Sequence, residues 1–158
     1  MAVARVAKKT LYAHFPSKED LILAALSRKR AAFAEKFLPQ ILAASSDPKE
    51  RLMALFELAK GWFQDPDFFG CIFINAAVEY SEPSHPINAC AREFKNLLRN
   101  FVREQAVAGG ARDPDILADQ IALLFEGATT VAQVQARPDA ATTAKVIAEQ
   151  LVDQAFRR

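Results

Sequence analysis

The sequence predicts an all-α protein, and three observations support this fold class. Of the 158 residues, 51% are hydrophobic and 25% are charged, which is typical of a soluble globular chain and too apolar for a disordered one. Alternating strand patterns of useful length are missing, whereas alanine is abundant and helix caps recur along the chain. The length favours one domain, or one domain with a small appendage.

Two helices are expected near the N-terminus. A short helix spans about residues 7–15 and places Leu11 and Phe15 inward. Ser17 then caps a longer helix, because an acidic residue, Asp20, follows three positions later. Pro39 is expected to end that helix, since proline disrupts a helix interior.

Caps and breakers mark five further helices. The helix over residues 86–108 is strongly amphipathic, and Gly109 and Gly110 follow it as a stop signal. The helix over residues 113–135 differs because apolar residues occur all round it, which indicates burial on two sides. The expected helices span about residues 47–64, 68–80, 86–108, 113–135 and 138–156.

The last two helices are the predicted dimer interface. Small and branched residues form a stripe on the final helix, which suits close helix packing. Two such helices from each of two chains would make a four-helix bundle, and the alternative is that both helices complete the core of a monomer. The expected interface residues are Ile121, Leu124, Ala128, Val131, Ile147 and Leu151.

Charge is divided unevenly along the chain. Residues 1–36 contain eight basic and three acidic residues, a net charge of +5, while the remainder carries −4. A basic end suggests a polyanionic partner, although a solvated charged surface is the plainer alternative. No run of 18 apolar residues or signal peptide is present, which argues against a membrane span and secretion. The two distant cysteines make no disulfide framework or zinc pattern, and a reducing cytoplasm fits.

Residues 6–26, VAKKTLYAHFPSKEDLILAAL, carry the most informative motif. Lysines, a hydroxyl and a phenol on one short exposed helix are the groups that phosphate and base-edge contacts need. Lys18 follows in the first turn of the next helix, where backbone N–H groups also favour an anion. From the residues alone, this segment is either a nucleic-acid contact or a basic helical hairpin without that role.

This segment closely resembles the recognition-helix region of the tetracycline-repressor (TetR) family, whose members typically show a stretch like VSxxTLYxHFxSKExLxxA. The resemblance implies a ligand-responsive transcriptional regulator, a repressor released from its operator by a small molecule. It also implies a partial DNA-binding domain with its connecting helix over residues 1–38, and an effector-binding and dimerisation domain over residues 39–158. The DNA-contact residues that it implies are Lys8, Lys9, Thr10, Tyr12, His14 and Lys18.

One departure from the family pattern lies at the N-terminus. Only nine residues precede Thr10, so the resemblance implies that the first helix and most of the second are absent from this sequence. Arg5 stands where the family usually has a turn glycine. The chain is therefore expected to bind DNA weakly and without sequence preference. A helical ligand-binding dimer that has lost specific DNA binding is the alternative function.

The segment Gly70–Glu82 is the candidate effector region. Cys71, Asn75 and Glu79 recur at four-residue intervals, so they form a polar stripe on an apolar helix. Such a stripe faces solvent, joins a core network or lines a cavity, and similar segments of the resembled family border the ligand cavity. A pocket for a small apolar or amphipathic effector is expected to involve Trp62, Phe63, Phe69, Cys71, Asn75, Glu79, Phe94 and Phe125.

Two other interpretations of these residues are weaker. The aromatic side chains could be plain core, and Cys71 could sense oxidants or electrophiles. Glu57, Glu79 and Glu126 could act as catalytic acids, but no nucleophile–base pair or metal spacing accompanies them. The sequence therefore predicts neither an enzyme nor a cofactor or metal site.

Overall fold

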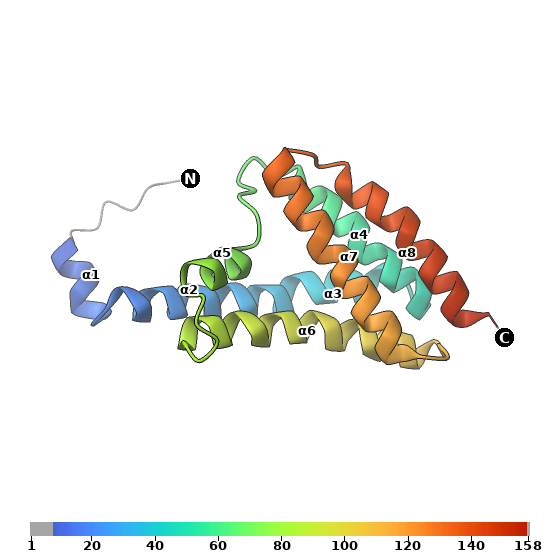
Figure 1. The fold of residues 1–158 in the computed structure, drawn as a ribbon, viewed down its shortest axis with the longest axis horizontal. Helices are drawn as coiled ribbons and strands as arrows, with labels where there is room; N and C mark the ends of the chain where they lie inside the picture. The colour runs from blue at the N-terminus through green and yellow to red at the C-terminus, as the bar shows by residue number, and fades with distance from the viewer. Residues whose placement is uncertain (1–7, 158) are drawn as a thin grey trace.

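The computed structural model describes residues 8–157, with side chains from Thr10 onward. All regular elements in this range are helical, so the predicted all-α fold is confirmed. Figure 1 shows α1 at one end of the molecule, with α7 and α8 packed against α4 at the other. The elements are α1 (Lys8–His14), α2 (Lys18–Ala32), η1 (Phe33–Phe37), α3 (Leu38–Ala44), α4 (Pro48–Phe63), α5 (Ile72–Glu79), α6 (Pro86–Ala108), α7 (Pro114–Gln135) and α8 (Ala140–Phe156).

The helix that begins at Lys18 does not end at Pro39, and this corrects the prediction. α2, η1 and α3 follow one another without a break as far as Ala44, forming the long rod in Figure 1. The element η1 is a π-helical turn, in which the N–H of Leu38 donates to the carbonyl of Phe33. Because this turn interrupts the regular α-helical pattern, Pro39 lies in the first turn of α3, where its missing N–H is tolerated.

The helix expected over residues 68–80 also needs correction, because α5 starts only at Ile72. Gly70 has a φ of +83°, a left-handed conformation that favours glycine and breaks helical geometry just before α5. The other expected helices begin and end within about two residues of their predicted bounds, as is usual for assignments of helix ends.

Buried side chains form two hydrophobic clusters. The larger joins α4, α6, α7 and α8, with Leu55, Phe56 and Ile121 among its fully buried members. The smaller joins Leu26 of α2 to Phe73 of α5 and Phe94 of α6. The helix α2 therefore rests on the body of the protein through α5 and α6.

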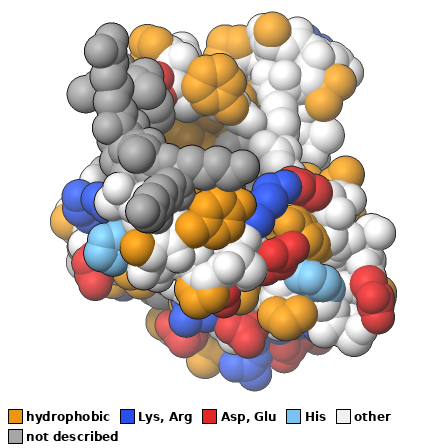
Figure 2. All heavy atoms as spheres, turned by 90° about the vertical axis from the view of Figure 1, so that its left-hand side faces the viewer, with side chains coloured by type: hydrophobic (Ala, Val, Ile, Leu, Met, Phe, Trp, Pro, Cys, Tyr) orange, Lys and Arg blue, Asp and Glu red, His pale blue; other side chains and the backbone are white. Residues whose placement is uncertain are grey.

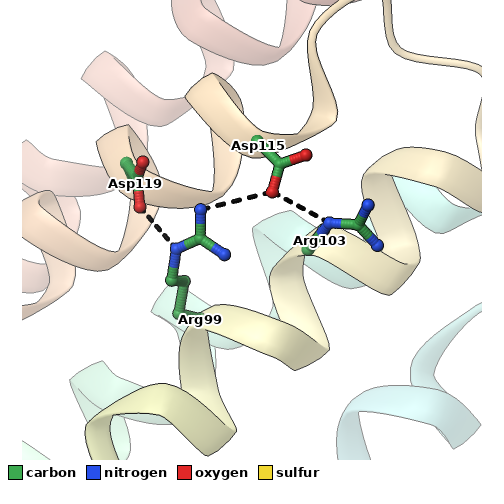
Figure 3. A network of polar contacts seen from close by, with 4 residues as sticks. All are labelled: Arg99, Arg103, Asp115 and Asp119. Atoms are coloured by element: carbon green, nitrogen blue, oxygen red, sulfur yellow. Dashed lines mark hydrogen bonds and ion pairs between the residues drawn. The ribbon is translucent and has the colours of Figure 1, made fainter.

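An ion-pair network fixes α6 against α7 (Figure 3). The Nε of Arg99 lies 2.5 Å from Oδ1 of Asp119, and the Nε of Arg103 lies 2.9 Å from Oδ1 of Asp115. Arg99 also reaches Asp115, at 3.3 Å through Nη2. Hydrogen bonds from the guanidinium groups lower the pKa of both carboxyls below the usual range.

Within residues 8–157, no helix combines the length and apolar character that crossing a membrane requires. The same residues contain no grouping of three or more histidine, cysteine or acidic side chains arranged to hold a metal ion.

Candidate nucleic-acid interface

A capping box stabilises the start of α2, directly after α1. The Oγ of Ser17 accepts a hydrogen bond from the backbone N–H of Asp20 at 3.1 Å, and the Asp20 carboxylate accepts one from the N–H of Ser17 at 3.1 Å. These reciprocal bonds satisfy N–H groups that a helix start leaves unpaired, and they confirm the cap predicted from sequence. Leu11 and Phe15, four residues apart, are both half-buried.

The candidate DNA-contact side chains of α1 face outward. Thr10, Tyr12 and His14 are exposed, with Tyr12 at 50% of its full accessibility. Lys8 and Lys9 have their backbone in α1, but their side chains lie outside the described residues. Figure 2 views this end of the molecule and shows charged groups of both signs mixed with hydrophobic ones. The end is therefore not uniformly basic.

Lys18, the remaining candidate, makes a contact that sequence reasoning did not foresee. Its Nζ lies 2.7 Å from Oε1 of Glu79 at the end of α5, and both side chains are more than half exposed. The hydrogen bond to Glu79 raises the pKa of Lys18, so the ammonium stays charged. A predicted phosphate contact and a predicted pocket residue thus meet directly.

Two residues of the predicted polar stripe, Asn75 and Glu79, face the surface. Asn75 is exposed, donates to the carbonyl of Phe69 at 3.3 Å and accepts from Nε2 of Gln133 at 3.1 Å. Phe69, another expected pocket residue, is 72% exposed. Asn75 therefore ties the loop before α5 to α7, instead of lining an enclosed cavity in this chain.

Cys71 is buried and stands at the N-cap of α5. Its Sγ is 3.3 Å from Nζ of Lys95, and the same Nζ donates to Oε2 of Glu126 at 2.6 Å. These three side chains come from the N-cap of α5, from α6 and from α7, and they connect the three helices at one point.

Four of the five expected aromatic pocket residues, all but the exposed Phe69, pack against other aromatic rings. Trp62 and Phe63 contact one another and Phe68, with ring centroids 5.0–5.5 Å apart. Phe94 stacks on Phe73 at 3.7 Å, and Phe125 lies 6.2 Å from Phe56. For these aromatics the plain-core interpretation fits the geometry.

A hollow of about 520 Å³ opens between α7 and α8 on the molecular surface. Five of the six expected interface residues line it: Leu124, Ala128, Val131, Ile147 and Leu151. Ile121 is the exception and a correction, because it is fully buried in the core of the monomer and offers a partner no surface. Leu123 also lines the hollow and is 76% exposed. Leu123 lies four residues before Gly127 and eight before Val131, so the sequence places all three on one face of α7. This spacing could have identified Leu123 as an interface residue.

A second hollow, of about 370 Å³, lies between α5 and α6, and we call it the α5–α6 groove. Sequence reasoning missed it, because the 75% exposure of Val78 on an apolar helix becomes visible only in the structure. Its lining residues are Phe73, Ile74, Ala77, Val78, Asn88, Ala91, Arg92, Lys95 and Asn96.

Two family models match the chain, one in each of its parts. The model described as "Bacterial regulatory proteins, tetR family" matches residues 2–25. The model described as "Tetracyclin repressor-like, C-terminal domain" matches residues 48–147, well over half of the chain. The chain belongs to the tetracycline-repressor (TetR) family. TetR-family members are transcriptional regulators and not enzymes, which agrees with the expectation from sequence.

Solved TetR-family structures share this fold. A TetR-type transcriptional regulator from Streptomyces avermitilis is 34% identical, with a TM-score of 0.81 over 97% of this chain and 82% of that one. The TetR-family regulator SCO4454 from Streptomyces coelicolor has a TM-score of 0.90 at 24% identity, over 98% and 81% of the two chains. The second likeness concerns the fold alone.

The transcriptional regulator YjdC, of the helix-turn-helix type and from Escherichia coli K12, is 27% identical over 104 residues. This match covers 66% of the present chain and 54% of YjdC, so the chain spans about half the length of the curated relatives it matches.

Proposed function

We propose that this chain is a homodimeric, cytoplasmic DNA-binding regulator that represses transcription and leaves its operator when a small apolar or amphipathic effector binds. The observation that carries the proposal is the exposed face of α1, where Thr10, Tyr12 and His14 project just before the capped start of α2. Helices of this kind enter the major groove, and a symmetric dimer places two of them in successive grooves of a palindromic site.

The surface between α7 and α8 supports the dimer. Its hollow is almost entirely apolar, and Leu123 and Ile147 are exposed there, with no element of the described residues 8–157 covering them. An exposed apolar patch of this kind is typical of an interaction surface, and a second copy offers the same patch across a two-fold axis. Two pairs of helices would then pack as a four-helix bundle.

The Lys18–Glu79 ion pair supports a link between effector and DNA. Glu79 ends α5, so a displacement of α5 would move the carboxylate that now holds the Lys18 ammonium. An effector shifts such an equilibrium only when it binds the two conformations with different affinity.

Fluorescence anisotropy with a labelled random-sequence duplex tests the DNA-binding part of this proposal. The chain should bind the duplex with an affinity that falls steeply with salt, because phosphate contacts release counterions. Tyr12→Ala should weaken binding, whereas Phe69→Ala removes an exposed aromatic ring of the loop between α4 and α5 and should leave it unchanged. No binding at low salt, or equal loss in both variants, would favour the ligand-binding dimer without a DNA role.

A further inference from the structure

The α5–α6 groove has an apolar floor and a cationic edge. Phe73 and Ala91 are buried beneath it, while Ile74, Ala77 and Val78 expose part or most of their apolar side chains along α5. Arg92 and Lys95 are the charged side chains of its lining, which contains no carboxylate. Its volume of about 370 Å³ is at the lower end of the range of about 300–1,000 Å³ for small-molecule sites.

Arg92 is held in one orientation by two bonds from a single nitrogen. Its Nη1 donates to the carbonyl of Pro83 at 2.7 Å and to Oδ1 of Asn88 at 3.2 Å. Asn88 is fixed in turn, since its Nδ2 donates to the carbonyl of Tyr80 at 3.0 Å. Among residues 8–157, Nε and Nη2 of Arg92 have no hydrogen-bond partner, and no carboxylate forms an ion pair with this guanidinium. A planar guanidinium held this way is suited to bind an anion with its remaining donors.

Lys95 differs from Arg92 because its charge is already compensated. Glu126 accepts from its Nζ at 2.6 Å, and the Cys71 sulfur lies on a second side at 3.3 Å. An ammonium carries three donors, so one remains for a ligand. Lys95 would therefore add a hydrogen bond, whereas Arg92 supplies the uncompensated positive charge.

We propose that the α5–α6 groove binds a small organic anion with an apolar body, whose charged group is held by Arg92 and whose apolar part covers Val78, Ala77 and Phe73. Binding of the apolar body is favoured because it buries apolar side chains that are exposed in the free chain. The guanidinium of Arg92 selects for a negatively charged group. Val78 directly precedes Glu79, the partner of Lys18, so a ligand on this turn of α5 contacts the element that reaches the DNA-binding end. This regulatory role rests on the proposed function, whereas the binding site does not.

The test uses anilinonaphthalene sulfonate, an apolar fluorescent anion, and its uncharged counterpart N-phenylnaphthylamine, with the full chain and two variants. Arg92→Gln removes the anchor charge, and Val78→Asp places a negative charge on the groove at an exposed position that tolerates it. Both should weaken binding of the anion by about tenfold or more, while Arg92→Gln leaves binding of the neutral probe unchanged. Arg103→Gln and Val107→Asp make the same changes elsewhere on α6 and should preserve binding of the anion.

The outcomes separate the site from its regulatory role. The site is overturned if the neutral probe binds as tightly as the anion, or if the groove variants bind the anion like their α6 controls. Circular dichroism confirms that each variant is folded. In a second measurement, saturating anion should change the affinity of the chain for a labelled random-sequence duplex, and Arg92→Gln should abolish that change. Anion binding without such a change overturns the regulatory role and leaves the DNA-binding proposal standing.

Discussion

Lys18 at the start of α2 and Glu79 at the end of α5 form an ion pair of 2.7 Å across 61 positions of sequence. The pair joins the candidate DNA-binding end to a helix of the body. Both side chains are exposed, and exposed pairs of this kind are weak. A DNA phosphate can therefore compete with Glu79 for the Lys18 ammonium.

Glu79→Gln should strengthen binding to a random-sequence duplex by about two- to fivefold, because Lys18 no longer has a competing carboxylate. The measurement is duplex affinity at one fixed salt concentration. Glu104→Gln removes an exposed charge far along α6 and corrects for the general change in net charge.

The same substitution in a Lys18→Gln background separates the ion pair from other effects of Glu79. If Lys18 mediates the effect, Glu79→Gln should then change affinity no more than Glu104→Gln does. An equal gain with and without Lys18 would show that Glu79 acts through general repulsion of DNA and not through this pair.

Leu123→Glu should convert a dimer into a folded monomer. The substitution places a charge in the hollow between α7 and α8, where a partner would bury it, yet Leu123 is exposed in the single chain and should tolerate it. Sedimentation velocity at micromolar concentration measures the state. Ile116→Glu changes an exposed residue of α7 outside the hollow and should remain dimeric. A monomeric wild-type chain would refute the dimer.

Two glycine substitutions should change stability in opposite directions. Gly70→Ala introduces a Cβ at a φ of +83° and against the side chain of Gln133, so it should destabilise the fold by about 1–3 kcal/mol. Gly61→Ala lies within α4 with open space around the new Cβ, and it should stabilise by up to about 1 kcal/mol. Urea denaturation measures both. Stabilisation by Gly70→Ala would contradict the loop conformation described before α5.

The network between α6 and α7 should stabilise the fold less in acid. Hydrogen bonds from Arg103 and Arg99 lower the pKa of Asp115 and Asp119 below the ordinary value of 3.8. A carboxyl whose pKa is lower in the folded state stabilises that state above its ordinary pKa. This contribution is lost as pH falls through the lowered value.

The double variant Asp115→Asn/Asp119→Asn should therefore unfold at lower urea than the wild type at about pH 6, and the difference should shrink as the pH falls below the ordinary pKa of 3.8. Asp153→Asn removes an exposed carboxyl of α8 that forms no ion pair within residues 8–157 and serves as the control. A wild-type advantage that persists undiminished at the lower pH would show that the carboxylate charges do not stabilise the α6–α7 contact.

Much of the fold was predictable because its signals are local. Ser17 and Asp20 lie within one turn, and the apolar stripe of α6 repeats over its whole length. The effect of Pro39 was mispredicted, since a π-helical turn that accommodates a proline leaves no clear trace in sequence. The start of α5 was misplaced because Gly70 signals a break only when its φ is known.

The contacts of the candidate functional residues were harder to predict, because they depend on tertiary structure. The helix α1 could be identified because its motif consists of adjacent residues. The partner of Lys18 is 61 positions away, and no local pattern indicates it. The regular spacing of Cys71, Asn75 and Glu79 suggested one polar face. The structure gives these residues three different environments, because Cys71 precedes the first turn of α5 and each of the others meets a different helix.

The central claim is that α1 and the start of α2, which we call the α1–α2 corner, contact DNA phosphates. The salt dependence of DNA binding tests this claim most directly. The logarithm of the binding constant for a random-sequence duplex is plotted against the logarithm of salt concentration for the wild type, Lys18→Gln and Lys60→Gln, the last an exposed lysine of α4. If Lys18 binds a phosphate, Lys18→Gln should reduce the magnitude of the slope by about one, and Lys60→Gln should leave it unchanged. Equal slopes for the wild type and Lys18→Gln would contradict the assignment of this corner to DNA.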